Sequence, residues 1–170
     1  MVGGLLVGAC SSGSKTSSHG AAETTTSSPP VSGPAAPAAV AGPACTVATA
    51  ALVTAKLGFA LTGPNVDRGP AATICTYDNP SNQAQSATVQ ITTGASPASF
   101  ATGRNGFAGH GEAVTDVSGL GEQAYSATLS VANVTNTTLV ARQGSNEVLI
   151  TTTAPADRLP GLMTAILALV

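Results

Sequence analysis

Residues 123–152 have the sequence QAYSATLSVANVTNTTLVARQGSNEVLITT, and this stretch decides the fold class. Over residues 123–131, apolar side chains alternate with Ser and Thr, which is the period of a strand with one buried face. Residues 139–142 and 147–152 repeat the strand pattern on either side of residues 143–146, a short polar turn typical of a hairpin. Consecutive strands joined by short turns predict an antiparallel sheet.

Three further strands are predicted upstream of this stretch. Residues 86–92 alternate strictly between apolar and polar side chains, and shorter strands are expected at residues 72–77 and 113–117. Residues 59–71 are rich in Gly and Pro, so we expect a loop there. The sheet is therefore built from most of the C-terminal two thirds of the chain.

Two helices are predicted at the ends of this region. Thr49 carries the hydroxyl of an N-cap and Gly58 supplies a stop, so we expect a helix over residues 49–57. Over residues 157–170 aliphatic side chains recur at helical spacing, which predicts a helix with one face against the sheet rather than a membrane anchor. These side chains are Leu159, Leu162, Met163, Ile166, Leu167 and Val170.

A third, short helix is expected to start at Ser96-Pro97, which supply an N-cap and a first helical residue. Residues 103–111 contain four glycines, so we expect a mobile loop after it. The resulting order is helix, two strands, helix, four strands, helix. This order predicts the α+β class, with an antiparallel sheet packed on one face by the N-terminal and C-terminal helices.

The N-terminal region contains a motif for attachment of a lipid. Val7-Gly8-Ala9-Cys10 has the form of a bacterial lipobox, with a branched aliphatic residue and two small residues before a cysteine. Small side chains let a signal peptidase approach the backbone beside the cut. The motif predicts that Cys10 carries a lipid and holds the protein on the extracytoplasmic face of the cell membrane. The alternative is a cysteine that occurs there by chance.

The segment before Cys10 is short for a signal peptide. A secretory signal has a basic segment and an apolar segment of about 7–15 residues before its cleavage site. Residues 1–9 contain no Lys or Arg and only a brief apolar run. We therefore expect that the translation start lies further upstream and that residues 1–9 are part of a longer signal. No stretch approaches the ~18 apolar residues that span a bilayer.

The acylated cysteine is expected to be followed by a linker, so that residues 10–44 form one unit. Of the 34 residues from 11 to 44, 29 are Ser, Thr, Gly, Pro or Ala. Such a segment buries too little apolar surface to offset its ordering entropy, which predicts disorder and an average span of about 30–35 Å. Residues 45–170 are sufficient for one extracytoplasmic domain.

Charge and aromatic residues are scarce. Only 14 of 170 residues are Asp, Glu, Lys or Arg, and the formal net charge is −2. Such a surface does not attract phosphate backbones, and five aromatic residues without Trp give few platforms for stacking bases or sugar rings. We expect no nucleic-acid partner, and a carbohydrate groove lined by aromatic residues is disfavoured.

The three cysteines fit export from the cytosol. If Cys10 is acylated, Cys45 and Cys75 remain as an even pair, which is normally oxidised outside the cytosol. A redox or metal pair is the alternative, but the chain has no Cys-x-x-Cys motif and only two histidines. We therefore predict a Cys45–Cys75 disulfide and no metal site.

His110, with Glu112 and Asp116 nearby, is the one group of residues that suggests acid–base chemistry. A general base needs a fixed position, and a histidine between two glycines is poorly fixed. The favoured interpretation is an exposed loop histidine. No nucleophile elbow, zinc-protease helix motif or phosphate-binding loop occurs in the sequence. No catalytic residue is therefore assigned.

Several short motifs occur in a recognisable order. They are Cys45, Thr49, the Leu57-Gly58 helix end, Cys75-Thr76-Tyr77, and Gly119-Leu120-Gly121-Glu122-Gln123-Ala124-Tyr125. Their order resembles that of small actinobacterial, mycobacterial-type cell-envelope lipoproteins grouped as a domain of unknown function. The resemblance covers residues 45–170 and implies an extracytoplasmic lipoprotein with the Cys45–Cys75 bond, without supplying catalytic residues. The chain departs from the pattern at Leu52, where an acidic residue would complete a capping box.

Three functions are consistent with these features. The preferred hypothesis is a non-catalytic, lipid-anchored domain that binds an unidentified envelope protein, glycan or lipid, and we expect a monomer without a cofactor. One alternative is an envelope enzyme in which the 103–111 loop closes over the sheet with His110 as base. The other is a structural wall lipoprotein in which the linker matters most.

Overall fold

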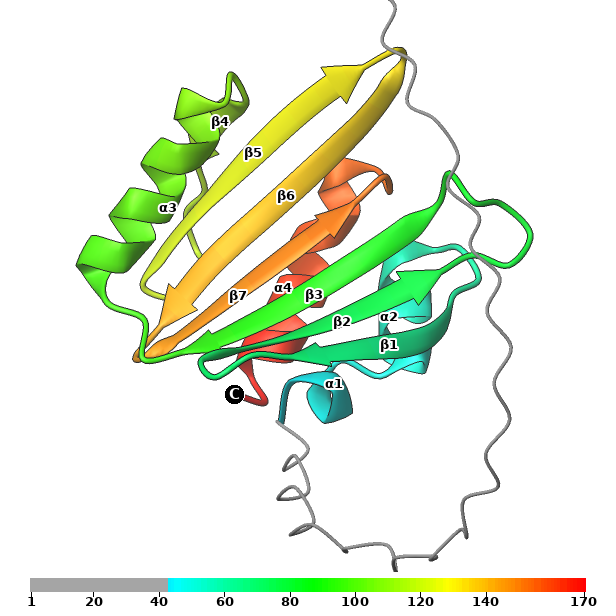
Figure 1. Ribbon diagram of the computed structural model, residues 1–170, viewed down its shortest axis with the longest axis horizontal. Helices are drawn as coiled ribbons and strands as arrows, with labels where there is room; N and C mark the ends of the chain where they lie inside the picture. The colour runs from blue at the N-terminus through cyan, green and yellow to red at the C-terminus, as the bar shows by residue number, and fades with distance from the viewer. Residues whose placement is uncertain (1–42) are drawn as a thin grey trace, which may run out of the picture. The chain divides into compact units, whose positions relative to one another are not determined.

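The computed structural model describes residues 43–170, so the predicted lipid site Cys10, the signal segment 1–9 and most of the predicted linker lie outside the described residues. The elements in chain order are α1 Pro43–Val47, α2 Ala50–Leu57, β1 Thr62–Arg68, β2 Ala72–Asp78, β3 Ser86–Thr93, α3 Pro97–Gly109, β4 Ala113–Asp116, β5 Gln123–Val131, β6 Val134–Gln143, β7 Asn146–Thr152, the short 3₁₀ helix η1 Ala156–Arg158, and α4 Leu159–Leu167. The strands form one antiparallel sheet in the order β1-β2-β3-β7-β6-β5-β4 (Figure 1). The predicted α+β class is confirmed.

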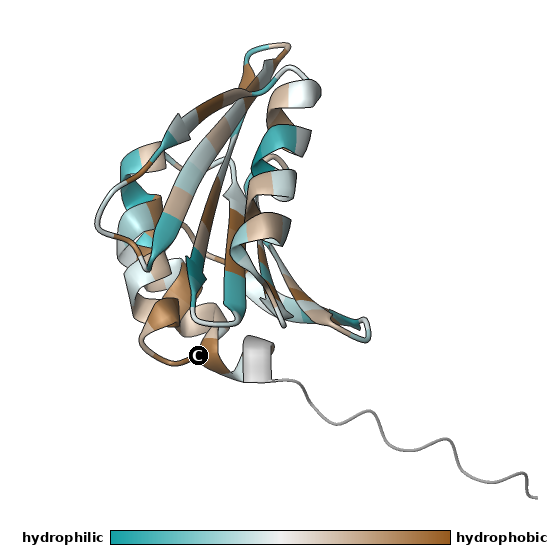
Figure 2. Ribbon diagram, turned by 90° about the vertical axis from the view of Figure 1, so that its left-hand side faces the viewer, coloured by the Kyte–Doolittle hydropathy of each residue, from teal (hydrophilic) through white to brown (hydrophobic). Residues whose placement is uncertain are grey.

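Helices cover both faces of the sheet. α2 and α4 pack on one face, which confirms the cover expected from the N-terminal and C-terminal helices, and α3 lies on the other face (Figure 2). Alternation along β6 explains the two layers, because Leu139 and Ala141 face α4 while Val140 faces α3. The sequence did not assign α3 to a face, and the structure places it opposite α2 and α4.

The larger core lies between the sheet and the α2/α4 layer. Its strand members are buried apolar side chains from β2, β3, β5, β6 and β7, and Leu120 packs among them from the turn before β5. The helical members on α4 are the predicted ones: Leu159, Leu162, Met163, Ile166 and Leu167, each at most 6% exposed. Val170 packs against this core from its edge. The predicted apolar stripe therefore faces protein.

The predicted caps of α2 are present. The Thr49 hydroxyl accepts a hydrogen bond from the backbone N–H of Leu52 at 3.3 Å, and Gly58 ends the helix with a φ of +81°. A left-handed residue at this position favours glycine because a Cβ would crowd the backbone. The local sequence therefore defines both ends of α2.

Two links hold the N-terminal helices to β2. The disulfide between Cys45 in α1 and Cys75 in β2 joins Cα atoms 5.7 Å apart. The buried Tyr77 hydroxyl donates a hydrogen bond to the Ala48 carbonyl between α1 and α2. Burial raises the pKa of Tyr77 to about 12. α1 itself begins at Pro43, inside the segment predicted as linker.

Residues 62–68 form strand β1 where the sequence predicts a loop. Among residues 43–170, β1 lies at the edge of the sheet and pairs only with β2, and six of its seven residues are exposed. An edge strand needs hydrogen bonds on one side only, so it tolerates Gly63 and Pro64. The pairing is interrupted between Thr62 and Asn65, around these two residues. The loop prediction is therefore wrong because pairing with β2 outweighs local composition.

α3 continues to Gly109, so the prediction of a mobile loop over residues 103–111 is wrong. Ser96 caps the helix in a reciprocal arrangement with Ser99, and Pro97 occupies the first turn. Phe100 is buried against the sheet and Phe107 packs beside the same cluster. Docking of these two aromatic side chains compensates for the low helix propensity of the glycines.

The β5–β6 hairpin is longer than the sequence predicts. β6 begins at Val134 rather than at residue 139, and the two strands pair from Gln123–Arg142 to Val131–Val134. Ala132 and Asn133 make the turn with φ values of 48° and 67°. Two positive φ values in succession match the tight turn whose twist suits a hairpin. No helix among residues 43–170 is long and apolar enough to cross a membrane.

Candidate functional site

The three residues considered for acid–base chemistry do not form a catalytic group in the structure. Asp116 pairs with Arg104, Nε to Oδ1 at 2.9 Å, and thereby joins β4 to α3. His110 is the exposed residue that ends α3, and with Glu112 it borders a shallow groove of about 230 Å³ beside Phe107. Within residues 43–170 no hydrogen bond links His110 to either carboxylate. The positions are consistent with a solvated histidine at a helix end.

α3 is fixed to the sheet by an aromatic cluster. The Phe100 and Phe107 rings lie with centroids 5.0 and 5.9 Å from that of Tyr125, which is 2% exposed. A Cβ at Gly103 would be 3.4 Å from the Tyr125 hydroxyl oxygen, which places this turn of the helix directly beside the tyrosine. Burial, with a smaller contribution from the Glu147 charge, raises the pKa of Tyr125. The cluster joins α3 to β5 and β6, with Val114 of β4 beside it, so α3 covers this part of the sheet face opposite α2 and α4.

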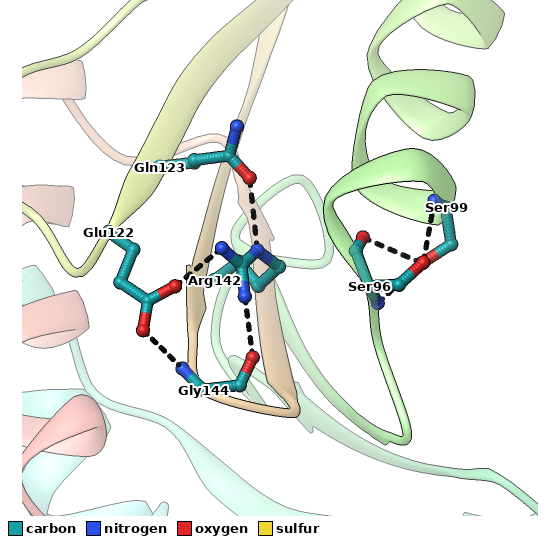
Figure 3. A network of polar contacts seen from close by, with 6 residues as sticks. All are labelled: Ser96, Ser99, Glu122, Gln123, Arg142 and Gly144. Carbon is teal, nitrogen blue, oxygen red and sulfur yellow. Dashed lines mark hydrogen bonds and ion pairs between the residues drawn. The ribbon is translucent and has the colours of Figure 1, made fainter.

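A hydrogen-bond network around Arg142 lies at the start of β5 and the β6–β7 turn (Figure 3). Arg142, 6% exposed, donates from Nε to Gln123 Oε1 at 3.0 Å, from Nη1 to the Gly144 carbonyl at 2.5 Å, and from Nη2 to Glu122 Oε2 at 2.5 Å. The second Glu122 oxygen accepts from the Gly144 N–H at 3.1 Å. Each guanidinium nitrogen thus has a partner, as a buried charge requires. The network joins the start of β5 to the β6–β7 turn.

Gly121 allows this network to form. Its φ is +57°, and a Cβ there would lie 2.5 Å from the backbone oxygen of Arg142, a contact that no side-chain rotation relieves. We expect Gly121→Ala to lower the free energy of unfolding by about 1–3 kcal/mol. Urea denaturation measures this, and Gly144→Ala, which has a similar φ of +59° and open space at its Cβ, is the control. Equal losses in both variants would show that the clash contributes nothing.

Glu122 makes stability depend on pH. The Gly144 N–H and the Arg142 guanidinium stabilise its carboxylate and lower the pKa of Glu122 below its ordinary value. Because the folded pKa is the lower one, this stabilisation is present above about pH 4.5 and is lost as the pH falls through the folded pKa. We expect the stability difference between wild type and Glu122→Gln to shrink between about pH 6 and about pH 3. A difference that is constant over this range would contradict the assignment.

Most of the face that α3 shares is not covered by a helix. α3 contacts β4 and β5, and no helix within residues 43–170 packs over β1, β2, β3 or β7 on this side (Figure 1). We call this surface the open face. The strand registers place on it Asn65 and Asp67 of β1, Ile74 and Thr76 of β2, Thr88, Gln90 and Thr92 of β3, and Glu147, Leu149 and Thr151 of β7.

A row of uncharged polar side chains crosses the open face. Directly paired positions on five neighbouring strands carry Asn65, Thr76, Thr88, Thr151 and Thr138. At about 4.8 Å between strands, the row extends about 19 Å. At its inner end the Thr138 and Thr151 hydroxyls lie 2.9 Å apart and hydrogen bond to each other. The four members on β1, β2, β3 and β7 offer hydroxyl and amide groups at regular spacing, whereas Thr138 on β6 is buried. The apolar Ile74 lies beside them, and Leu149 packs partly against the Phe100–Tyr125–Val140 cluster.

Glu147 adds one carboxylate to the open face. It lies directly opposite Arg142 and Thr92, but the Arg142 guanidinium turns to Glu122 instead. Within the described residues the Glu147 side chain has no hydrogen bond or ion pair. Partial burial raises the pKa of Glu147. A half-buried carboxylate without a partner is available to accept hydrogen bonds from a ligand.

Sequence reasoning missed both the arginine network and the open face. The open face had a signal, because Thr88 and Gln90 occupy the polar positions of the predicted 86–92 strand and lie outside the main core. The network had none, since Glu122 and Arg142 are twenty residues apart and meet only when β5 pairs with β6. No group of three or more His, Cys, Asp or Glu within residues 43–170 is placed to hold a metal ion.

Comparisons with known proteins give no relatives. No family model, curated protein or solved structure matches this chain.

Proposed function

We propose that this protein is a lipid-anchored lipoprotein of the cell envelope whose domain, residues 45–170, binds a ligand on the open face without catalysing a reaction. The resemblance to actinobacterial envelope lipoproteins and the lipobox at Cys10 support the location. The Cys45–Cys75 disulfide is consistent with an oxidising compartment. A membrane anchor followed by a long linker suits a domain that reaches a partner within the envelope.

The open face is the observation that carries the binding function. Within residues 43–170, a seven-stranded sheet with two helical layers leaves four adjacent strands uncovered on one side. These strands carry four of the five members of the polar row, two aliphatic side chains and the carboxylates Asp67 and Glu147. The scarcity of charge favours an uncharged ligand with many hydrogen-bonding groups, such as a glycan or an extended peptide. Flat, pre-formed polar surfaces bind without the convergent acid, base and nucleophile that catalysis needs.

The location is tested by replacing Cys10. In the native host, Cys10→Ser removes the thiol that would take the lipid, so we expect the protein to leave the membrane fraction or to remain unprocessed. Cell fractionation and the mass of the mature N-terminus measure both outcomes. A processed variant that stays in the membrane fraction would contradict the anchor.

The binding surface is tested by photo-crosslinking in intact cells. A photoreactive residue at Gln90, at the centre of the open face, should trap a discrete partner that mass spectrometry or glycan staining identifies. The matched control is a photoreactive residue at Ala55, which is exposed on α2 in the opposite layer. Equal trapping at both positions would refute a specific open face, and no trapping at either would favour a purely structural lipoprotein.

A further inference from the structure

Exposed apolar side chains gather at the end of the β5–β6 hairpin. Within residues 43–170, the large hydrophobic side chains that are exposed are Val66 at 42%, Leu129 at 39%, Val131 at 61%, Val134 at 44% and Leu169 at 57%. Three of these five lie in residues 129–136, which we call the hairpin tip. Scattered exposed hydrophobic residues are ordinary, but a concentration at one projecting point indicates contact with another phase or molecule.

The hairpin tip projects beyond the rest of the sheet. On one side, the pairing of β4 with β5 ends at Thr128, and on the other, the pairing of β7 with β6 starts at Thr137. Within the described part of the chain, the residues between these limits form a two-stranded ribbon with no neighbouring strand on either edge (Figure 1). A ribbon with unpaired edges presents backbone N–H and C=O groups that are open to contact with another surface.

The apolar side chains of the hairpin tip point the same way. Leu129 and Val131 are two residues apart on β5, and Val131 is directly opposite Val134 on β6, so all three share one side of the ribbon. The Ser130 and Thr135 hydroxyls lie 2.9 Å apart, also paired across the ribbon, and take the other side. No Asp, Glu, Lys, Arg or His occurs from residue 123 to residue 141.

We propose that the hairpin tip inserts into the surface of the lipid bilayer to which the chain is tethered. A tip without charge enters the interface with no ionic group to desolvate, and the three aliphatic side chains leave water. The free backbone edges limit the depth, because hydrocarbon cannot satisfy their N–H and C=O groups. Insertion is therefore shallow, and it does not depend on anionic lipid.

Attachment to the membrane raises the fraction of molecules in which the hairpin tip is inserted, even if the insertion itself is weak. This step rests on the proposed anchor at Cys10, from which residues 11–42 lead to α1. Those 32 residues span at most about 110 Å when extended, against about 34 Å for the ten residues of β6, so the tether is long enough for the tip to meet the bilayer. A tethered site meets its membrane at high effective concentration. Three side chains are also far less than the roughly 800 Å² per partner of a stable protein interface.

A tryptophan reporter tests the insertion, because the chain contains no Trp. The full chain is coupled through the Cys10 thiol to a maleimide lipid in neutral phosphatidylcholine vesicles, while Cys45 and Cys75 stay disulfide-bonded. For Val131→Trp we expect a shift of emission to shorter wavelength and several-fold weaker acrylamide quenching upon coupling. Val66→Trp, at a valine 42% exposed on edge strand β1, should show neither change.

A charge at the tip completes the test. Adding Val134→Asp to Val131→Trp should abolish the emission shift, whereas adding Val66→Asp should leave it intact, with far-UV circular dichroism showing that both variants are folded. No shift for Val131→Trp, or an equal shift for Val66→Trp, would overturn the proposal. A shift that grows with protein concentration without vesicles would assign the tip to a second copy instead. Chemical coupling replaces acylation here, so this result is independent of whether cells acylate Cys10.

Discussion

Ile166→Ala is expected to lower the free energy of unfolding by about 2–5 kcal/mol. Ile166 is 0% exposed and lies in the middle of the α4 stripe that packs on β6, β7 and α2. Removing three side-chain carbons there forfeits their transfer from water and leaves a cavity that the sheet beneath is too rigid to close. Equilibrium denaturation by urea, followed by circular dichroism, measures the loss.

Leu169→Ala is the matched control on the same C-terminal segment. Leu169 is 57% exposed, so its truncation should change stability by less than about 0.5 kcal/mol. If both variants lost the same amount, α4 would not be packed on the sheet as the structure shows. A helix that faces lipid would behave differently again, since neither variant would then be destabilised in water.

Loss of the Cys45–Cys75 disulfide should cost about 3–4 kcal/mol on the chain-entropy model. The bond closes a loop with a sequence separation of 30 and ties α1 to β2, whose Cys75 is fully buried. The double variant Cys45→Ala/Cys75→Ala removes the crosslink without leaving a buried thiol. Thermal and urea denaturation under non-reducing conditions give the difference from wild type.

Reduction of the wild type provides an independent comparison for this variant. Under strong reductant the wild type should fall to nearly the stability of the double variant, while the variant itself should not respond. The bond would be contradicted if reductant left the stability of the wild type unchanged. A non-reducing peptide map in which the Cys45 and Cys75 peptides are separate would also contradict it.

Patterns with a strong local period were predicted well. Strict alternation defined β3 and β5, and the caps Thr49 and Gly58 defined α2, because period-two burial and capping hydrogen bonds depend only on nearby residues. The aliphatic spacing after residue 157 likewise predicted α4 and the residues it buries. The expected α+β class followed from the order of these elements.

Elements that depend on a distant partner were not predicted. β1 contains Gly63 and Pro64 and is a strand only because β2 supplies its hydrogen bonds. α3 passes through three glycines because Phe100 and Phe107 dock on Tyr125, a residue 25 positions further along the chain than Phe100. Local propensity is weak compared with such tertiary contacts.

For the candidate site, the sequence by itself determined the types of side chain and little of their arrangement. It established the scarcity of charge, the absence of a catalytic motif and the candidate lipid site at Cys10. Only the tertiary structure decided that Asp116 pairs with Arg104 away from His110 and that α3 covers one end of its face. It also decided that Arg142 turns to Glu122, which leaves Glu147 without a partner among residues 43–170. The reason is physical, because strand order and register determine which side chains become neighbours, and both are set by packing across the whole sheet.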